Sequence, residues 1–192
     1  MKKVNKKLKN QMGFTLVEIA IVMVIIGLLI GGVLKGQGLI QNAKVKNVVK
    51  MADGLRAAVM GFYDKYGVMP GDENEAGAPT GTNIEGNGNG RIDTATERFE
   101  VYRDLVLAGL LDGSYNGTSD LPTHPFGGNV DIYWVDPGPG AARHCIRYFN
   151  LPAEVCQEID QKYDDGVYNT GSIAGSADYA EGTTVATFYI VF

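Results

Sequence analysis

The chain has 192 residues, with 17 Lys and Arg, 22 Asp and Glu and a formal net charge of −5. Five of the basic residues stand within the first nine positions, so the chain from Phe14 onward has twelve basic and twenty-two acidic residues, a net charge of −10. This acidity argues against a broad basic patch that binds nucleic-acid phosphates. The length allows one domain with a modest core besides a membrane helix.

The first predicted element is an apolar segment at residues 14–34, whose twenty-one residues are all apolar, Gly or Thr except Glu18. As a helix it would be about 32 Å long at ~1.5 Å per residue, which matches a hydrocarbon core of ~30 Å. Lysines precede it, and basic flanks stay in the cytoplasm. The sequence therefore predicts a single-pass membrane protein with a cytoplasmic N-terminus and an exported body.

Glu18 is the exception in this segment. A carboxylate within a spanning helix costs about 2.5–3.5 kcal/mol and is functional by default, and the segment offers no Lys or Arg as a partner. Cleavage between Gly13 and Phe14 would create an α-ammonium four residues away. Two charges ~4 Å apart attract by about 4 kcal/mol at an effective dielectric of ~20. The amine could come from the same chain or from an identical neighbour, where the pair would fix the register of an assembly.

Residues 13–18, Gly-Phe-Thr-Leu-Val-Glu, resemble the processing and N-methylation motif of type IV prepilins and type II secretion pseudopilins. The resemblance implies cleavage of a basic leader, residues 1–13, after Gly13 by a prepilin peptidase. It also implies methylation of the Phe14 amine, and stacking of the apolar helices into a filament core in which Glu18 takes part. An ordinary signal anchor has no reason to hold this Glu, and the basic start lacks an A-x-A type cleavage site.

The segment at residues 35–66 has the pattern of an amphipathic helix. Its apolar residues recur at steps of three and four, which predicts one buried stripe: Val48, Ala52, Leu55, Val59, Phe62 and Tyr66. Gly67 and Pro70 end the pattern. We expect this helix to continue the membrane segment as one spine, with a bend or local melting near the glycines at 31–38; the alternative is two separate helices.

Residues 71–96 are rich in Gly, Asn, Thr and acids, which predicts a long surface loop. Part of it resembles half of a calcium loop, because oxygen-bearing side chains recur at intervals with Gly between them: Glu85, Asn87, Asn89 and Asp93. The match is imperfect, since the twelfth position falls on Thr96. The alternative is an ordinary Asn-Gly turn cluster, so calcium is the one cofactor that the sequence leaves open.

The rest of the predicted head, residues 67–192, contains short helices and strands. Thr94 and Glu97 can form a capping box. A helical stripe then ends at Gly113 and consists of Phe99, Tyr102, Val106 and Leu110. Alternation predicts a strand at 130–134. Three further elements follow: a strand with Ile146 and Tyr148, a short helix from Pro152, and a final strand at 185–192.

This order of elements predicts an α+β protein with a pilin-like fold. A long N-terminal helix, transmembrane in its first half, packs against a small antiparallel sheet. Cys145 and Cys156 form a close pair, which in an oxidising compartment predicts a disulfide worth about 3 kcal/mol on the chain-entropy model. The alternative is two unpaired buried thiols.

The sequence contains no nucleophile elbow, HExxH motif or phosphate loop, and His124 and His144 are interpreted as exposed or capping residues. We therefore expect a structural subunit and no enzyme; a signal-anchored periplasmic binding protein or enzyme is the rival. The resemblance implies as partners other pilin or pseudopilin subunits, the prepilin peptidase, an inner-membrane assembly platform and membrane lipid. It places the chain in the bacterial inner membrane and then in a filament, either a type IV pilus or a type II secretion pseudopilus, as a major or a minor subunit.

Overall fold

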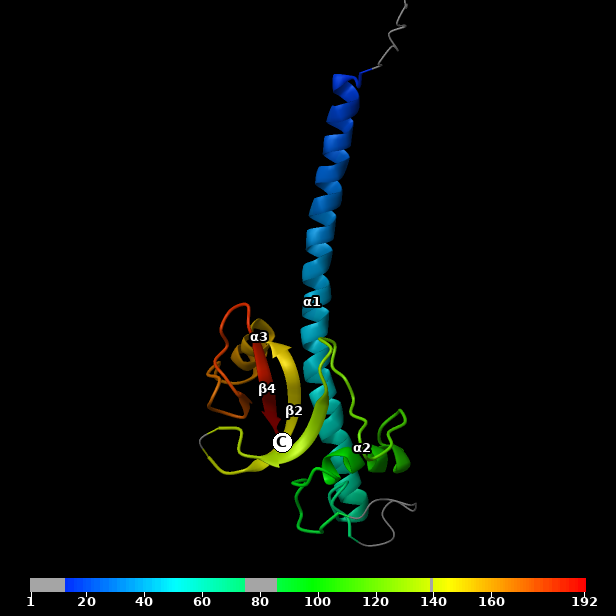
Figure 1. The fold of residues 1–192 in the computed structure, drawn as a ribbon, viewed down its shortest axis with the longest axis vertical. Helices are drawn as coiled ribbons and strands as arrows, with labels where there is room; N and C mark the ends of the chain where they lie inside the picture. The colour runs from blue at the N-terminus through cyan, green and yellow to red at the C-terminus, as the bar shows by residue number, and fades with distance from the viewer. Residues whose placement is uncertain (1–12, 75–85, 139) are drawn as a thin grey trace, which may run out of the picture. The chain divides into compact units, whose positions relative to one another are not determined.

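The computed structural model describes residues 13–74, 86–138 and 140–192. The chain divides into two compact units, Met1–Asn42 and Ala43–Phe192, and the second unit is here called the head. The elements in chain order are α1 (Leu16–Tyr66), α2 (Glu97–Leu107), β1 (Val130–Val135), β2 (Arg143–Pro152), α3 (Ala153–Tyr163), β3 (Ile173–Gly175) and β4 (Thr184–Val191) (Figure 1).

The described part of the first unit is helical from Leu16 onward, and every residue from Gly13 to Lys35 is exposed. Helix α1 contains an 18-residue window with a mean hydropathy of 2.8, none of it buried. By length and composition this helix can cross a membrane. The predicted basic leader, except for Gly13, lies outside the described residues.

Within the head, α1 contributes one buried stripe: Val45, Val48, Ala52, Leu55, Ala58, Val59 and Phe62. This confirms the predicted periodicity, although Tyr66 is only partly buried. The helix ends at Tyr66, and Gly67 adopts a positive φ of 76°, as expected of a residue that terminates a helix. Because α1 is one helix over 51 residues, the alternative of two separate helices is wrong.

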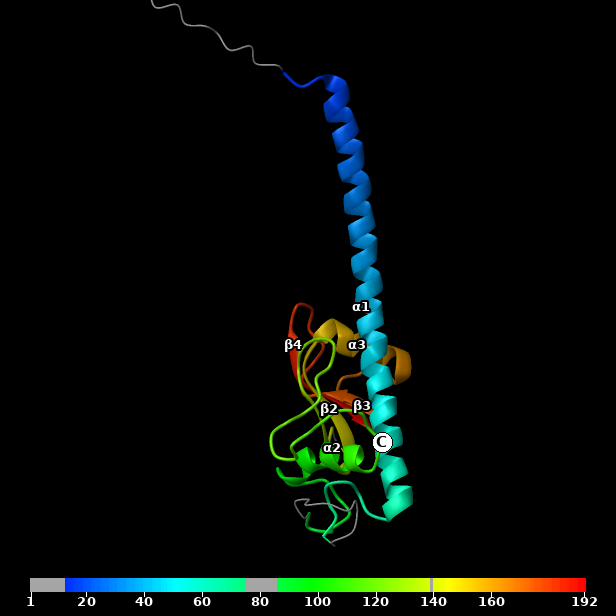
Figure 2. The same ribbon diagram turned by 90° about the vertical axis from the view of Figure 1, so that its right-hand side faces the viewer.

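The sheet is antiparallel, with the strand order β1-β2-β4-β3. Ile132 of β1, Ile146 of β2 and Ile190 of β4 stand in register and are buried in the common core. The hydroxyl of Tyr148 on β2 donates to the carbonyl oxygen of Val48 on α1 at 2.9 Å, so the sheet packs against the head's part of α1 (Figure 2). The predicted α+β pilin-like fold is thus confirmed.

Helix α2 buries a different face from the predicted stripe. Its fully buried apolar residues are Val101, Tyr102 and Leu105, whereas Leu110 lies beyond the helix and is exposed. The same face also buries three acids: Glu97, Glu100 and Asp104. Apolar periodicity does not find this face because half of its positions are carboxylates.

The predicted bridge between Cys145 and Cys156 is not formed: both are buried free thiols. Side chains alternate along a strand, and Ile146 and Tyr148 of β2 belong to the core cluster. Cys145 therefore faces the other side of the sheet, while Cys156 of α3 packs inside the core cluster. The alternative of two buried thiols holds, and burial raises the pKa of the Cys145 thiol to about 11.

Candidate functional site

The N-terminal motif begins with a short non-helical segment, residues 13–15. The Phe14 side chain is 85% exposed. A Cβ atom built on Gly13 would meet no heavy atom within 4 Å, so the fold of the described chain leaves room for a side chain there. Any requirement for Gly at this position therefore comes from a molecule that recognises the segment.

Glu18 has partners within its own helix. The backbone N–H and the hydroxyl of Thr15 each donate to Oε2 of Glu18 at 2.8 Å. In return, the Glu18 N–H donates to the Thr15 hydroxyl oxygen at 3.2 Å. This reciprocal arrangement is a capping box, in which two helix N-terminal N–H groups are satisfied by side chains.

The capping box gives Glu18 hydrogen-bond partners that the sequence analysis did not assign to it. A carboxylate in an apolar segment does not depend on an external amine for all of its hydrogen bonds, because Thr15 supplies two. Both of these bonds use Oε2, so the carboxylate can still receive a further donor at its other oxygen. The T-x-x-E spacing of Thr15 and Glu18 is the sequence signal that would have revealed this pair.

The predicted calcium site spans residues 85–93, of which Glu85 lies outside the described residues. The side-chain amides of Asn87 and Asn89 donate to the two oxygens of Asp93 at 3.2 and 3.1 Å. The carboxylate of Glu97 accepts the backbone N–H groups of Asn87, Asp93 and Thr94. This geometry favours the alternative of an Asn-Gly turn cluster, which closes through its own hydrogen bonds.

The predicted surface loop is partly buried at its start. Asp72 and Glu73 are each 2% exposed. Asp72 accepts the N–H groups of Asn89 and Gly90 at 3.2 and 2.6 Å, which fastens the Asn-Gly cluster to the end of α1. The polar composition of this segment predicted that it is exposed. Composition does not show that the Asp72 carboxylate accepts hydrogen bonds from several backbone N–H groups.

Asp104 of α2 is a further buried acid that no sequence pattern singles out. Its Oδ2 accepts the Gly71 N–H at 2.6 Å, and its other oxygen, Oδ1, has no hydrogen-bond partner in the described residues. Burial, followed by the nearby Glu73 carboxyl, raises the pKa of Asp104 well above its usual range. Asp104 is therefore a protonated acid at neutral pH that links the segment after α1 to α2.

One cluster in the described residues has the donor atoms of a metal site: Asp160, Asp164 and Asp165, whose carboxylate oxygens lie within 4.8 Å of one another. Each is already hydrogen-bonded by the chain. Asp160 accepts from the Tyr179 hydroxyl at 2.7 Å, Asp164 from two backbone N–H groups, and Asp165 from Thr170 at 2.6 Å. The cluster organises the turns between α3 and β3.

Both histidines are buried, which corrects the expectation of exposed or capping residues. His124 makes contacts through both ring nitrogens, with the Phe149 carbonyl oxygen and the Phe126 N–H. His144 Nε2 accepts the Ile92 N–H at 3.2 Å. Burial lowers the pKa of both side chains, that of His144 to about 4, so both are neutral structural groups near pH 7.

Comparison with known proteins assigns the N-terminal motif. Residues 8–34 match the family described as the prokaryotic N-terminal methylation motif. The chain is 36% identical over 107 residues to a fimbrial protein of Neisseria meningitidis serogroup B, a match that covers 55% of the chain and 59% of that protein. It is 35% identical over 77 residues to the type IV major pilin PilE of Neisseria gonorrhoeae, covering 40% of the chain and 46% of that protein.

The chain thus spans about half the length of the curated relatives it matches. No solved structure matches the chain. The matched methylation motif lies at the start of the long apolar helix α1, and the proteins that this chain is similar to are a fimbrial protein and a type IV major pilin.

Proposed function

We propose that the protein is a structural subunit of a type IV pilus, cleaved after Gly13, methylated on the Phe14 amine and assembled through its N-terminal helix. The observation that carries the proposal is the exposed apolar segment with a single acid, which lies within the residues that match the N-terminal methylation motif. The names of the relatives, a fimbrial protein and a major pilin, favour the pilus over the secretion pseudopilus.

The physical basis of assembly is the apolar surface from Leu16 to Leu34. A helix that is apolar on all sides needs lipid or other helices around it. Lipid tails are as apolar as Leu, so moving the helix from the bilayer into a bundle gains little hydrophobic energy. Packing and polar contacts must therefore decide whether a subunit leaves the membrane.

Glu18 and Phe14 supply such a polar contact. In the uncleaved chain the Phe14 nitrogen is a neutral amide; after cleavage it is an ammonium. Oε2 of the Glu18 carboxylate already accepts hydrogen bonds from Thr15, and its second oxygen would accept a hydrogen bond from the amine of an adjacent subunit. Processing would then create the charge that makes the apolar bundle favourable, so that only mature subunits assemble.

The same proposal sets the partners and the location. The prepilin peptidase would act on Gly13, membrane lipid would cover the apolar segment before assembly, and an inner-membrane platform would add subunits to homologous ones. The head would face the periplasm before assembly and the outside of the cell afterwards. No basic patch for nucleic acid is expected on an acidic head.

Sequencing of the mature N-terminus in the producing bacterium tests the processing step. We expect the chain to begin at a methylated Phe14. A chain that still begins at Met1, or at any residue other than Phe14, would contradict the proposal.

Two variants separate the charge of Glu18 from its capping role. Glu18→Gln keeps a capping-box side chain but removes the charge, whereas Thr15→Ala removes the cap and keeps the charge. If the carboxylate pairs with an amine, Glu18→Gln should lose filaments while Thr15→Ala keeps them, with both proteins inserted and processed. Equal loss in both variants would show that Glu18 acts as a cap only.

A further inference from the structure

The charges of the mature chain are segregated along the sequence. Residues 35–52 contain four lysines and no acid: Lys35, Lys44, Lys46 and Lys50. After residue 52 the chain has eight basic and twenty-one acidic residues. The part of α1 that enters the head is therefore basic, and the remainder of the head is strongly acidic.

Two of these lysines form an exposed surface on α1, here called the basic face: Lys46 and Lys50. They lie one helical turn apart, and both are exposed, whereas Val45, Val48 and Ala52 of the same turns are buried in the core. The ion pairs of the described residues involve Arg side chains, and none includes Lys46 or Lys50. The basic face thus presents two cations without a carboxylate partner in the described part of the chain.

The opposite charge gathers on α3 and the turn between β3 and β4. Residues 153–192 contain seven acids and one basic residue. Five of the acids are exposed, and the four on α3 and this turn are here called the acidic face: Glu154, Glu158, Asp178 and Glu181. The carboxylate of Glu154 accepts the Gly182 N–H at 2.6 Å, so the start of α3 and this turn form one surface.

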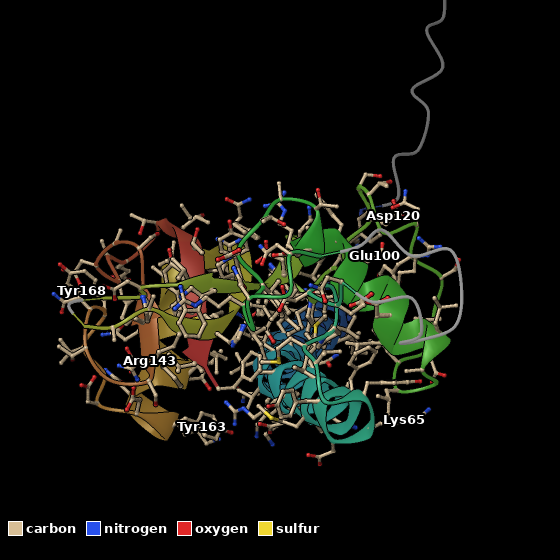
Figure 3. All side chains as sticks on the ribbon, turned by 90° about the horizontal axis from the view of Figure 1, so that it is seen from below. Lys65, Glu100, Asp120, Arg143, Tyr163 and Tyr168 are labelled. Carbon is tan, nitrogen blue, oxygen red and sulfur yellow. The ribbon has the colours of Figure 1, made fainter. Side chains whose placement is uncertain are left out.

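The turn that carries Asp178 and Glu181 lies away from α1, whereas α3 packs beside α1: Ile159 and Tyr163 of α3 line one hollow with Val49 and Asp53 of α1. In both Figure 1 and Figure 2, α1 runs along one side of the head and the turn between β3 and β4 lies on the other. Seen from below, Tyr168, which precedes β3, and Lys65, near the end of α1, lie on opposite sides of the head (Figure 3). In the described residues, no ion pair joins the basic face to the acidic face of the same head.

We propose that the basic face of one copy docks on the acidic face of a second copy of this chain. The inference rests on the proposed function, because it names how neighbouring subunits recognise each other. The contact is heterologous, since two different surfaces meet, and a heterologous contact that does not close into a ring extends as a filament. Each subunit would then use both faces, one toward each neighbour.

Chain length favours a second copy over lipid headgroups as the occupant. Lys46 and Lys50 follow Leu34 by twelve and sixteen residues, about 18 and 24 Å of helix at ~1.5 Å per residue. A headgroup layer adds only about 5–8 Å to each side of the hydrocarbon core. Screening at physiological salt limits the reach of exposed charges to about 8 Å.

Charge reversal in the full chain, produced in its own bacterium, tests the inference through the yield of sheared filaments. Lys46→Glu with Lys50→Glu should lower the yield about ten-fold, which corresponds to about 1.4 kcal/mol in the contact. Glu158→Lys with Glu181→Lys should lower it similarly. The chain with all four reversals should recover filaments, because each face again meets its opposite. Lys65→Glu, a single charge reversal elsewhere on α1, is the control and should leave the yield unchanged.

The outcomes separate this contact from lipid binding and from misfolding. Normal yield in the Lys46/Lys50 double variant, or no recovery in the fourfold variant, overturns the proposed contact. Loss of binding to phosphatidylglycerol vesicles by the double variant, without recovery of filaments in the fourfold variant, would assign the basic face to lipid. If the unchanged, processed chain formed no filaments, the proposed function itself would fail. Unchanged thermal unfolding of the variants excludes misfolding as the cause.

Discussion

From Leu16 to Leu34, α1 exposes every residue, whereas from Val45 to Phe62 the same helix buries seven side chains in the head. The first stretch is uniformly apolar and holds one polar pair, Thr15 with Glu18. The described part of the head, in contrast, buries nine polar or charged side chains beside its apolar core. The comparison teaches that a helix that is apolar on all sides needs lipid or other helices around it. In contrast, most polar groups buried in the described part of the head have hydrogen-bond partners there.

The largest effect is expected at the processing site. Gly13→Leu should abolish cleavage. The structure leaves room for the new side chain, so the substitution should affect only recognition by the peptidase. The measurement is a gel of membrane fractions, in which the variant should keep the unprocessed size while thermal unfolding of its head stays unchanged. Cleavage of the Gly13→Leu chain would contradict the view that Gly13 is required by the peptidase.

The core of the head comes next. Phe62→Ala removes a fully buried side chain and should lower the free energy of unfolding by about 3–5 kcal/mol. Ile25→Ala removes an exposed apolar group from the same helix and should leave that free energy unchanged while it weakens filament incorporation. Urea denaturation of the detergent-solubilised chain measures both. Equal destabilisation by the two changes would mean that both stretches of α1 contribute to the free energy of unfolding of the head.

Acid should destabilise the head through His144. Its pKa is lowered to about 4 in the folded state, mainly by burial, against about 6.5 when unfolded. The stability that depends on the neutral ring is present above pH 6.5 and is lost as the pH falls toward 4, about 3 kcal/mol in total. His144→Gln keeps an acceptor for the Ile92 N–H and should flatten this dependence. An unaltered acid profile in the variant would contradict the assignment.

An effect of opposite sign is expected from Asp104. Its raised folded-state pKa means that stability is greatest below the unfolded pKa near 4 and falls as the pH rises through neutrality. Asp104→Asn retains an acceptor for the Gly71 N–H and should gain relative to the parent by up to about 1.4 kcal/mol per pH unit. Asp120→Asn, an exposed change, is the control. A gain that does not grow with pH would rule out the buried protonated acid.

The sequence predicted the parts of the fold that depend on apolar periodicity. The stripe on α1 and the alternation on β1 are confirmed, since burial of Val48, Leu55 and Ile132 follows directly from spacing. The capping box of Thr94 and Glu97 also forms, one turn before the predicted stripe. Strand β3 has three residues and leaves too short a pattern to detect.

Features that depend on distant partners could not be predicted in this way. Asp131 is fully buried because Arg147, on the neighbouring strand, binds both of its oxygens at 2.7 and 2.6 Å. Cys145 and Cys156 are near in sequence, but strand alternation places Cys145 on the opposite face of the sheet. At the candidate site, the motif itself is recognisable from the sequence, whereas the hydrogen bonds of Glu18 to Thr15 were missed although their spacing was visible.

The bond between Thr15 and Glu18 has a consequence for proteolysis. Because the helix carries its own cap, its first turn is held in place, and the peptide bond between Gly13 and Phe14 lies in exposed, non-helical chain just ahead of it. A protease that grips this link need not melt any helical turn before it cuts. The new N-terminus then lies at the start of a helix that is already formed, and it can contact another chain without refolding.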